Sequence, residues 1–175
     1  MYYDPMMVLA ERKHQGQFRK TRPGETPVPY FEHPRNVVKN LLDWGEPENS
    51  PAIGIAWGHD LMEDTDVTDR EILEASDENV LQGIRKLTYR KGTDKQQYLR
   101  NVASSGNRNV LLVKISDRIH NSRDFIRYSG RVRAYEYLHE ADCIRAAVQA
   151  LPADPVLKNA LAAWQELDQS LQKRN

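Results

Sequence analysis

The chain has one cysteine, Cys143, among its 175 residues. A single cysteine excludes an intrachain disulfide and any zinc site built from paired cysteines, and it favours a buried thiol in a reducing compartment. Long apolar runs are also missing, since no stretch approaches the roughly 18 apolar residues that a membrane-spanning helix needs. The first five residues hold no basic segment followed by an apolar one. We therefore expect no signal peptide and a cytoplasmic location.

The chain also lacks an excess of charge of either sign. It has 25 Lys and Arg residues and 25 Asp and Glu residues, so its formal net charge is zero. Nucleic acids and anionic membrane surfaces attract proteins with basic excess, and the composition gives no argument for either partner. A phosphate-bearing small-molecule substrate would have to be bound by local basic residues. The sequence leaves open whether the chain forms a homo-oligomer.

Strand patterns are nearly absent, and helical patterns extend through most of the chain. A length of 175 residues with 39% hydrophobic residues suits one core. We therefore expect an all-α fold with a single domain over residues 1–175. The expected helices cover residues 4–18, 33–44, 51–64, 78–86, 95–104, 109–124, 131–150 and 154–172, with a capping box at Thr68 to Glu71 and loops at 20–32 and 88–94.

The most informative segment is His59-Asp60-Leu61-Met62-Glu63-Asp64, which continues an apolar stretch. On a helix, residues four apart share a face, so Glu63 follows His59 by one turn and Asp64 follows Asp60 by one turn. Four ionisable groups on one side of an apolar segment are costly unless a cation neutralises them. Glu63 and Asp64 are then near enough to deprotonate a water molecule or to protonate a leaving oxygen.

Two distant residues complete a candidate set of metal ligands, namely His33 upstream and Asp117 downstream. With His59 and Asp60 they give two imidazoles and two carboxylates, which suit Mn, Fe, Zn, Ni or Mg better than a soft metal. Asn121 follows Asp117 by four residues and so faces the same site. Each residue alone has a plainer explanation, such as helix capping or a structural ion pair. The joint pattern carries the interpretation.

That joint pattern resembles the hydrolase domain of the RelA/SpoT family, a branch of the HD superfamily. It is most similar to the small stand-alone alarmone hydrolases, including the metazoan SpoT homologues. The matching stretches are Ala10 to Lys20, Pro29 to Pro34, Gly58 to Thr65 and Val113 to Asn121, with a weaker match at Arg131-Val132 and Tyr135. Together they extend from about residue 9 to about residue 150.

The resemblance implies an all-α HD fold that binds one Mn²⁺-type ion. The implied reaction removes the 3′-pyrophosphate from ppGpp or pppGpp, the alarmones of the stringent response, and gives GDP or GTP plus pyrophosphate. The implied roles are metal binding by His33, His59, Asp60 and Asp117, service of the catalytic water by Glu63 and Asp64, base stacking by Arg19 with Lys20 approaching the nucleotide, ribose contact by Asn121, and phosphate contact by Arg131 and Tyr135.

Two features depart from the family pattern. The loop between Lys20 and His33 is a few residues longer than usual, which leaves base selectivity open. Gly58 stands where the family has an apolar residue, and we expect a minor packing effect. One alternative is the same metal chemistry on ppApp, NADPH or another phosphoester. The other is a catalytically silent nucleotide-binding or partner-binding HD module, against which the intact Glu63-Asp64 pair argues.

Overall fold

The computed structural model describes residues 3–173, and these form eleven α-helices. The helices are α1 Asp4–Lys13, α2 Glu32–Asp43, α3 Pro51–Gly58, α4 Leu61–Asp64, α5 Asp69–Ala75, α6 Glu78–Leu87, α7 Lys95–Ser104, α8 Arg108–Tyr128, α9 Arg131–His139, α10 Asp142–Gln149 and α11 Pro155–Gln172. Within this range, strand-like pairing is limited to an isolated bridge between Phe18 and Pro29. The all-α prediction is confirmed, and none of the described helices is long and apolar enough to cross a membrane.

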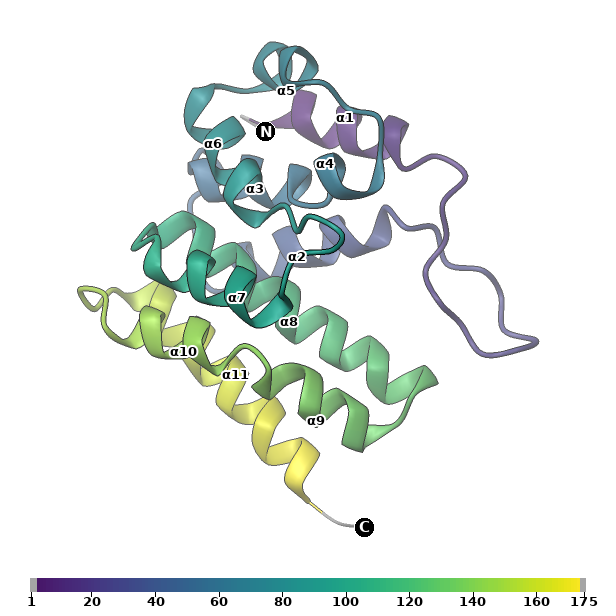
Figure 1. Cartoon of the computed structure of the whole chain (residues 1–175), viewed down its shortest axis with the longest axis vertical. Coiled ribbons are helices and arrows are strands. Elements are labelled where there is room, and N and C mark those ends of the chain that lie inside the picture. Colours follow the sequence, from purple (N-terminus) through teal and green to yellow (C-terminus); the bar gives the residue numbers. More distant parts are fainter. Residues whose placement is uncertain (1–2, 174–175) are drawn as a thin grey trace.

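The long helix α8 is the centre of the fold (Figure 1). It packs against α2, α3 and α6 on the N-terminal side and against α9, α10 and α11 on the C-terminal side. Its first half is apolar and buried, because residues 110–113 are all inaccessible to solvent. Ser116 then connects α8 to α2 by donating to the Val37 carbonyl at 2.9 Å and accepting from the Asn40 amide at 3.1 Å. These contacts fix the position of α2 along the axis of α8.

Several helix starts follow from the sequence signals. Ser50 accepts from the Ala52 amide in front of Pro51, and Asp77 accepts from the Val80 amide. The capping box is present, since the Thr68 side chain accepts from the Glu71 amide and the Glu71 carboxylate accepts from the Thr68 amide. Each side chain satisfies a backbone N–H that has no partner within its helix.

Four expected helices differ in extent or continuity. The helix expected over 4–18 ends at Lys13, and the one expected over 109–124 continues to Tyr128. The segment 51–64 is broken between α3 and α4, because the His59 ring donates to the Ala56 carbonyl at 2.7 Å. That carbonyl would otherwise accept from the Asp60 amide in a continuous helix. The segment 131–150 is likewise two helices, with the chain turning at Glu140 and Ala141.

Helices α3 and α6 approach closely because glycines stand at their contact. A Cβ atom on Gly83 would lie 2.3 Å from Cδ1 of Ile55, and one on Gly58 would lie 2.4 Å from Cδ1 of Ile84. Both distances are far inside van der Waals contact. The glycine that precedes His59 therefore lets α6 lie against α3, and a larger residue there would require its neighbours to move.

His139 joins the three C-terminal helices. Its Nδ1 lies 2.9 Å from Asp142 at the start of α10, and its Nε2 lies 2.9 Å from Asp168 in α11. Burial opposes the charged ring, but the two carboxylates outweigh burial and raise the pKa of His139 above its ordinary value. The protonated imidazole therefore stabilises this end of the fold.

Candidate metal centre

Two buried histidines face each other between α2 and α3. His33 is the second residue of α2, His59 directly follows α3, and their Nε2 atoms are 3.0 Å apart. The helices are held in this relation partly by the Phe31 and Trp57 rings, which stack with centroids 5.6 Å apart. Both rings are buried, with His33 1% and His59 2% exposed. Their nitrogens therefore depend on protein groups or on a bound ion for partners.

Hydrogen bonds on the far side of each ring assign the tautomers. The Nδ1–H of His59 donates to the Ala56 carbonyl, so in the neutral ring the lone pair lies on Nε2. The Nδ1 of His33 lies 2.8 Å from Nδ1 of His120, and burial together with the His33 charge lowers the pKa of His120 to about 4. A neutral His120 can accept from the Nδ1–H of His33, so the neutral form of His33 likewise carries its lone pair on Nε2. This is the outer arrangement that orients histidines toward a metal ion.

Two carboxylates reach the same point. Oδ2 of Asp60 lies 3.3 Å from Nε2 of His33 and 3.2 Å from Nε2 of His59. Oδ1 of Asp117 lies 3.3 Å and 3.9 Å from the same two nitrogens. Ligand atoms of His33, His59 and Asp60 all lie within 4.8 Å of one another. The structure thus brings all four predicted ligand residues together.

The electrostatics of this cluster fit a cation. Burial alone would raise the pKa of both aspartates, but the His59 and His33 rings at Asp60, and Lys114 at Asp117, keep both values well below the ordinary range. Burial likewise opposes a charged His59, yet the Asp60 and Asp117 carboxylates raise its pKa to about 9. A buried site that draws a proton this strongly offers the same place to a divalent ion.

The carboxylates expected to act on water lie next to this cluster, on α4. Oε2 of Glu63 accepts from the Tyr89 amide at 3.1 Å, and burial with the Asp60 charge outweighs that bond and raises the pKa of Glu63. The Tyr30 hydroxyl lies 2.7 Å from Oδ2 of Asp60 and 2.9 Å from Oδ2 of Asp64. Burial and these two acids raise the pKa of Tyr30, so it remains a hydrogen-bond donor to them. Tyr30 thus joins a ligand residue to a candidate catalytic residue.

A cavity of about 330 Å³ lies beside the four candidate ligand residues, and two of them, Asp60 and Asp117, line it. Its acidic lining residues are Asp60, Glu63, Asp64 and Asp117, its basic ones are Lys95, Lys114 and Arg118, and the rest are Asn121 and the tyrosines Tyr30, Tyr89, Tyr98 and Tyr137. Tyr30, Lys114 and Tyr137 were not among the predicted site residues. Lys114 had a signal, because it stands three residues before Asp117 and such spacing places side chains on one helical face. Tyr30 lies in the turn before α2, where helical spacing does not apply.

Arg19 is close to the cavity but is engaged within the protein. Its Nη2 donates to Oδ1 of Asn121 at 2.6 Å and to Oδ2 of Asp124 at 2.8 Å, and its Cζ lies 5.3 Å from the centre of the Tyr30 ring. Asn121 in turn donates to Oδ1 of Asp117 at 2.5 Å. The structure therefore connects Arg19 to the metal cluster through one amide.

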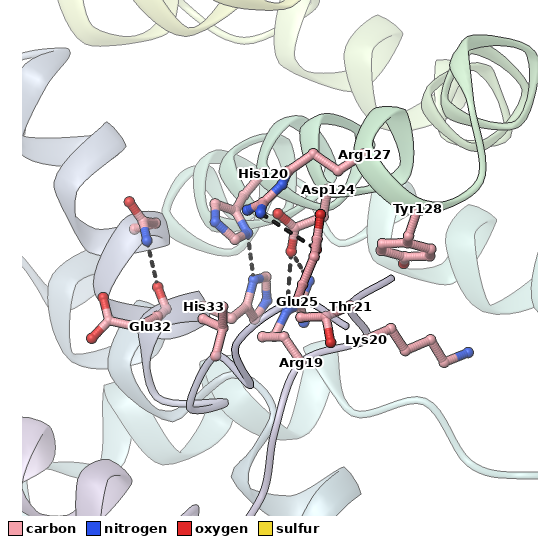
Figure 2. Close-up of a pocket in the computed structure, with 12 residues that line it drawn as sticks. Arg19, Lys20, Thr21, Glu25, Glu32, His33, His120, Asp124, Arg127 and Tyr128 are labelled. Atoms are coloured by element: carbon pink, nitrogen blue, oxygen red, sulfur yellow. Dashed lines mark hydrogen bonds and ion pairs between the residues drawn. The ribbon is translucent and has the colours of Figure 1, made fainter. Parts of the chain in front are cut away.

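Lys20 belongs to a second, smaller pocket of about 140 Å³. This pocket lies on the other side of His33 and includes Arg19, His120 and Asp124 (Figure 2). Figure 2 shows the Lys20 side chain extending away from the His33 and His120 pair. The structure thus places Lys20 beside Arg19 but not in the cavity that holds Glu63 and Asp64.

The two residues of the weaker match, Arg131 and Tyr135, do not reach either pocket. Arg131 donates to the Ser170 carbonyl of α11, and the Tyr135 ring packs on His139 with centroids 4.2 Å apart. The reason is the helical phase of α9, in which Tyr137 instead turns toward α8. The structure thus places Arg131 and Tyr135 outside both pockets, and α9 presents Tyr137 to the larger cavity.

Comparison with known proteins gives the chain its relatives, although no family model matches it. A guanosine-3′,5′-bis(diphosphate) 3′-pyrophosphohydrolase from Aquifex aeolicus is 37% identical over 119 residues, which cover 65% of this chain and 16% of that protein. The zebrafish (Danio rerio) guanosine-3′,5′-bis(diphosphate) 3′-pyrophosphohydrolase MESH1 is 31% identical over 122 residues, 68% of this chain and 66% of that protein. The GTP pyrophosphokinase rsh of Brucella melitensis is 34% identical over 140 residues, 74% of this chain and 18% of that protein.

A solved structure shares the fold over nearly its whole length. It is that of a metazoan ortholog of SpoT described as hydrolysing ppGpp, with a TM-score of 0.77 and 25% identity over 97% of this chain and 94% of that one. The chain thus spans under a fifth of its long bacterial relatives and about two thirds of the zebrafish protein. The fold, the histidine and aspartate cluster and these relatives agree, and the chain belongs to the HD-type hydrolases of the RelA/SpoT family.

Proposed function

We propose that the chain hydrolyses ppGpp or pppGpp at the 3′ position, giving GDP or GTP plus pyrophosphate, as a single metal-dependent domain of the cytoplasm. One observation carries the proposal. Two imidazole nitrogens and two carboxylates converge at the end of a cavity whose other walls hold three basic side chains. That combination suits a cation and a polyanionic substrate together. The names of the Aquifex and zebrafish relatives supply the substrate.

His33, His59, Asp60 and Asp117 would hold the cation, which we propose to be Mn²⁺. Mixed imidazole and carboxylate ligands suit this ion, and four protein residues leave positions for substrate oxygen. When bound, it would supply polarisation of a phosphoryl oxygen and activation of a water molecule. Hydrogen bonds already orient all four residues, through Ala56, His120, Tyr30 and Lys114.

Proton transfer is assigned to the pair on α4. Desolvation and the neighbouring Asp60 charge raise the pKa of Glu63, so it exchanges a proton more readily near neutral pH than an isolated glutamate does. Asp64 is oriented by the Tyr30 hydroxyl. We propose that Glu63 accepts a proton from the attacking water and that Asp64 aligns this water with the phosphoryl group.

The substrate groups can be distributed over the basic walls of the cavity. Lys114 donates to Oδ2 of Asp117 at 2.9 Å, so a positive charge lies next to the metal cluster where phosphoryl groups would react. Lys95 and Arg118 lie farther along the cavity with Tyr137, and we assign them to phosphate in place of Arg131 and Tyr135. Arg19 and Asn121 remain the proposed contacts of the nucleoside, with Lys20 at its edge. Arg19 already forms an ion pair with Asp124, so its stacking on a guanine base has to be tested. The experiment therefore includes a nucleotide with a different base.

The experiment is Mn²⁺-dependent release of pyrophosphate, with ppGpp, ppApp and NADPH compared under identical conditions. Preferred cleavage of ppGpp to GDP and pyrophosphate supports the proposal, and cleavage of only ppApp or NADPH would overturn the base assignment. Asp60→Ala should remove activity and bound metal together. Asp66→Ala is the matched control, since this neighbouring aspartate has a side chain that is 91% exposed. Metal binding without turnover of any of the three would favour a silent binding module.

A further inference from the structure

A carboxylate outside the cavity joins basic side chains from three helices. Glu140 directly follows α9, and its Oε2 accepts from Nζ of Lys95, the first residue of α7, at 2.7 Å. The same oxygen lies 3.5 Å from Nη1 of Arg118 in α8. Its other oxygen, Oε1, lies 3.2 Å from Nη1 of Arg133 in α9. Glu140 is thus the common counterion of α7, α8 and α9.

Two of these three cations line the cavity, while Glu140 itself does not. Arg118 and Lys95 both lie against the Tyr137 ring, with the Arg118 Cζ 4.1 Å and the Lys95 Nζ 5.2 Å from its centre. The Arg118 side chain is 2% exposed and that of Lys95 is 44% exposed. Glu140 is therefore paired with two of the cations that line this part of the cavity, the buried Arg118 and the partly exposed Lys95, beside the Tyr137 ring.

On the basis of the proposed function, we propose that Glu140 is a positioning residue that holds Lys95 and Arg118 at the phosphate-binding wall of the cavity. A free lysine samples many rotamers, and fixing it before the substrate arrives lowers the cost of binding. Burial would raise the pKa of Glu140, but Lys95 and the two arginines outweigh burial and lower it, so the carboxylate is charged at neutral pH. The counterion is therefore present whenever the enzyme meets its substrate.

This role predicts a change in substrate binding rather than in chemistry. Glu140→Ala should raise KM for ppGpp by about tenfold, equivalent to about 1.4 kcal/mol, and leave kcat within about twofold. Within the described part of the chain, no hydrogen bond or ion pair joins Lys95 or Arg118 to Glu63 or Asp64, which perform the proton transfer in our scheme. Glu140→Gln keeps an oxygen acceptor for Lys95 and should recover most of the loss.

The experiment measures KM and kcat for ppGpp, and separately the dissociation constant of inorganic pyrophosphate with Mn²⁺ by calorimetry. Glu136→Ala is the matched control, because Glu136 pairs with Arg133 at 3.4 Å one turn earlier on α9 without contacting the cavity wall. In a Lys95→Ala background, replacing Glu140 should have a clearly smaller effect than in the wild type. Should Glu140→Ala fail to fold, the comparison of Glu140→Leu with and without Lys95 tests the same coupling, because leucine fills much of the same space and offers Lys95 no acceptor.

The outcomes separate this inference from the proposed function. Equal KM and equal pyrophosphate affinity in Glu140→Ala and Glu136→Ala would overturn the role of Glu140 even if ppGpp is hydrolysed. A loss of the same size with and without Lys95 would also overturn it, since Glu140 would then not act through the lysine. If ppGpp is not a substrate but pyrophosphate binding weakens only in the Glu140 variants, the positioning role stands and the substrate proposal fails.

Discussion

Replacing Glu63 by Gln removes one proton acceptor and changes little else. Oε2 of Glu63 accepts from the Tyr89 amide at 3.1 Å, and the glutamine oxygen can keep that bond and the position of the 88–94 loop. Glu63 belongs to the cavity but not to the cluster of His33, His59 and Asp60. We therefore expect Glu63→Gln to fold normally and to bind the cation as the wild type does.

The expected loss is in kcat. A positioned general base contributes about 10²–10⁴-fold to a rate, or about 2.7–5.4 kcal/mol of barrier. The assay is steady-state release of pyrophosphate from ppGpp with Mn²⁺, together with elemental analysis of the purified variant for metal. KM should change little, because an amide and a carboxylate fill the same volume.

Asp60→Ala provides the contrast, since it should lose metal and turnover together. Two results would refute the assignment of Glu63. If kcat falls less than about fivefold, Glu63 is not the base, since that is well below the usual contribution of such a group. If Glu63→Gln loses its metal, Glu63 supports the ion, and the division between ligand residues and proton-transfer residues is wrong.

Three further predictions concern the pocket and the fold. Arg19→Ala should raise KM for ppGpp without loss of metal, and an unchanged KM would remove this residue from the nucleoside site. The raised pKa of His139 stabilises the folded state fully below its unfolded pKa of about 6.5, and this contribution is lost as pH rises through the folded pKa. In urea unfolding at pH 5.5, His139→Gln should be less stable than the wild type by about 0.5–1 kcal/mol, because it loses the charged pair. The difference should be smaller at pH 9. An equal difference in stability at the two pH values would contradict the linkage. Gly83→Val should cost about 1–3 kcal/mol because its side chain meets Ile55, whereas Val at the exposed neighbour Gln82 should cost less than 1 kcal/mol in the same titration.

Local sequence signals predicted most of the helices because their causes are local. Ser50 before Pro51, Thr68 with Glu71, and the loop at 88–94 act within a few residues, and the structure has each of them. The break after Gly58 was not predicted. It depends on the orientation of the His59 ring, which bonds to the Ala56 carbonyl because His33 on another helix faces its opposite nitrogen. Periodicity carries no information about such a contact.

The sequence by itself determined the residue types of the candidate metal site, since an HD-type pattern needs those imidazoles and carboxylates at those spacings. Only the tertiary structure decided which neighbours complete the site. Tyr30, Lys114 and Tyr137 come together through the packing of α2, α8 and α9. On α9 it is Tyr137 that lines the cavity, whereas Tyr135, two residues earlier, faces another direction. The rotation of a helix about its axis, relative to a helix far away in the sequence, depends on many core contacts together. No single sequence motif encodes it.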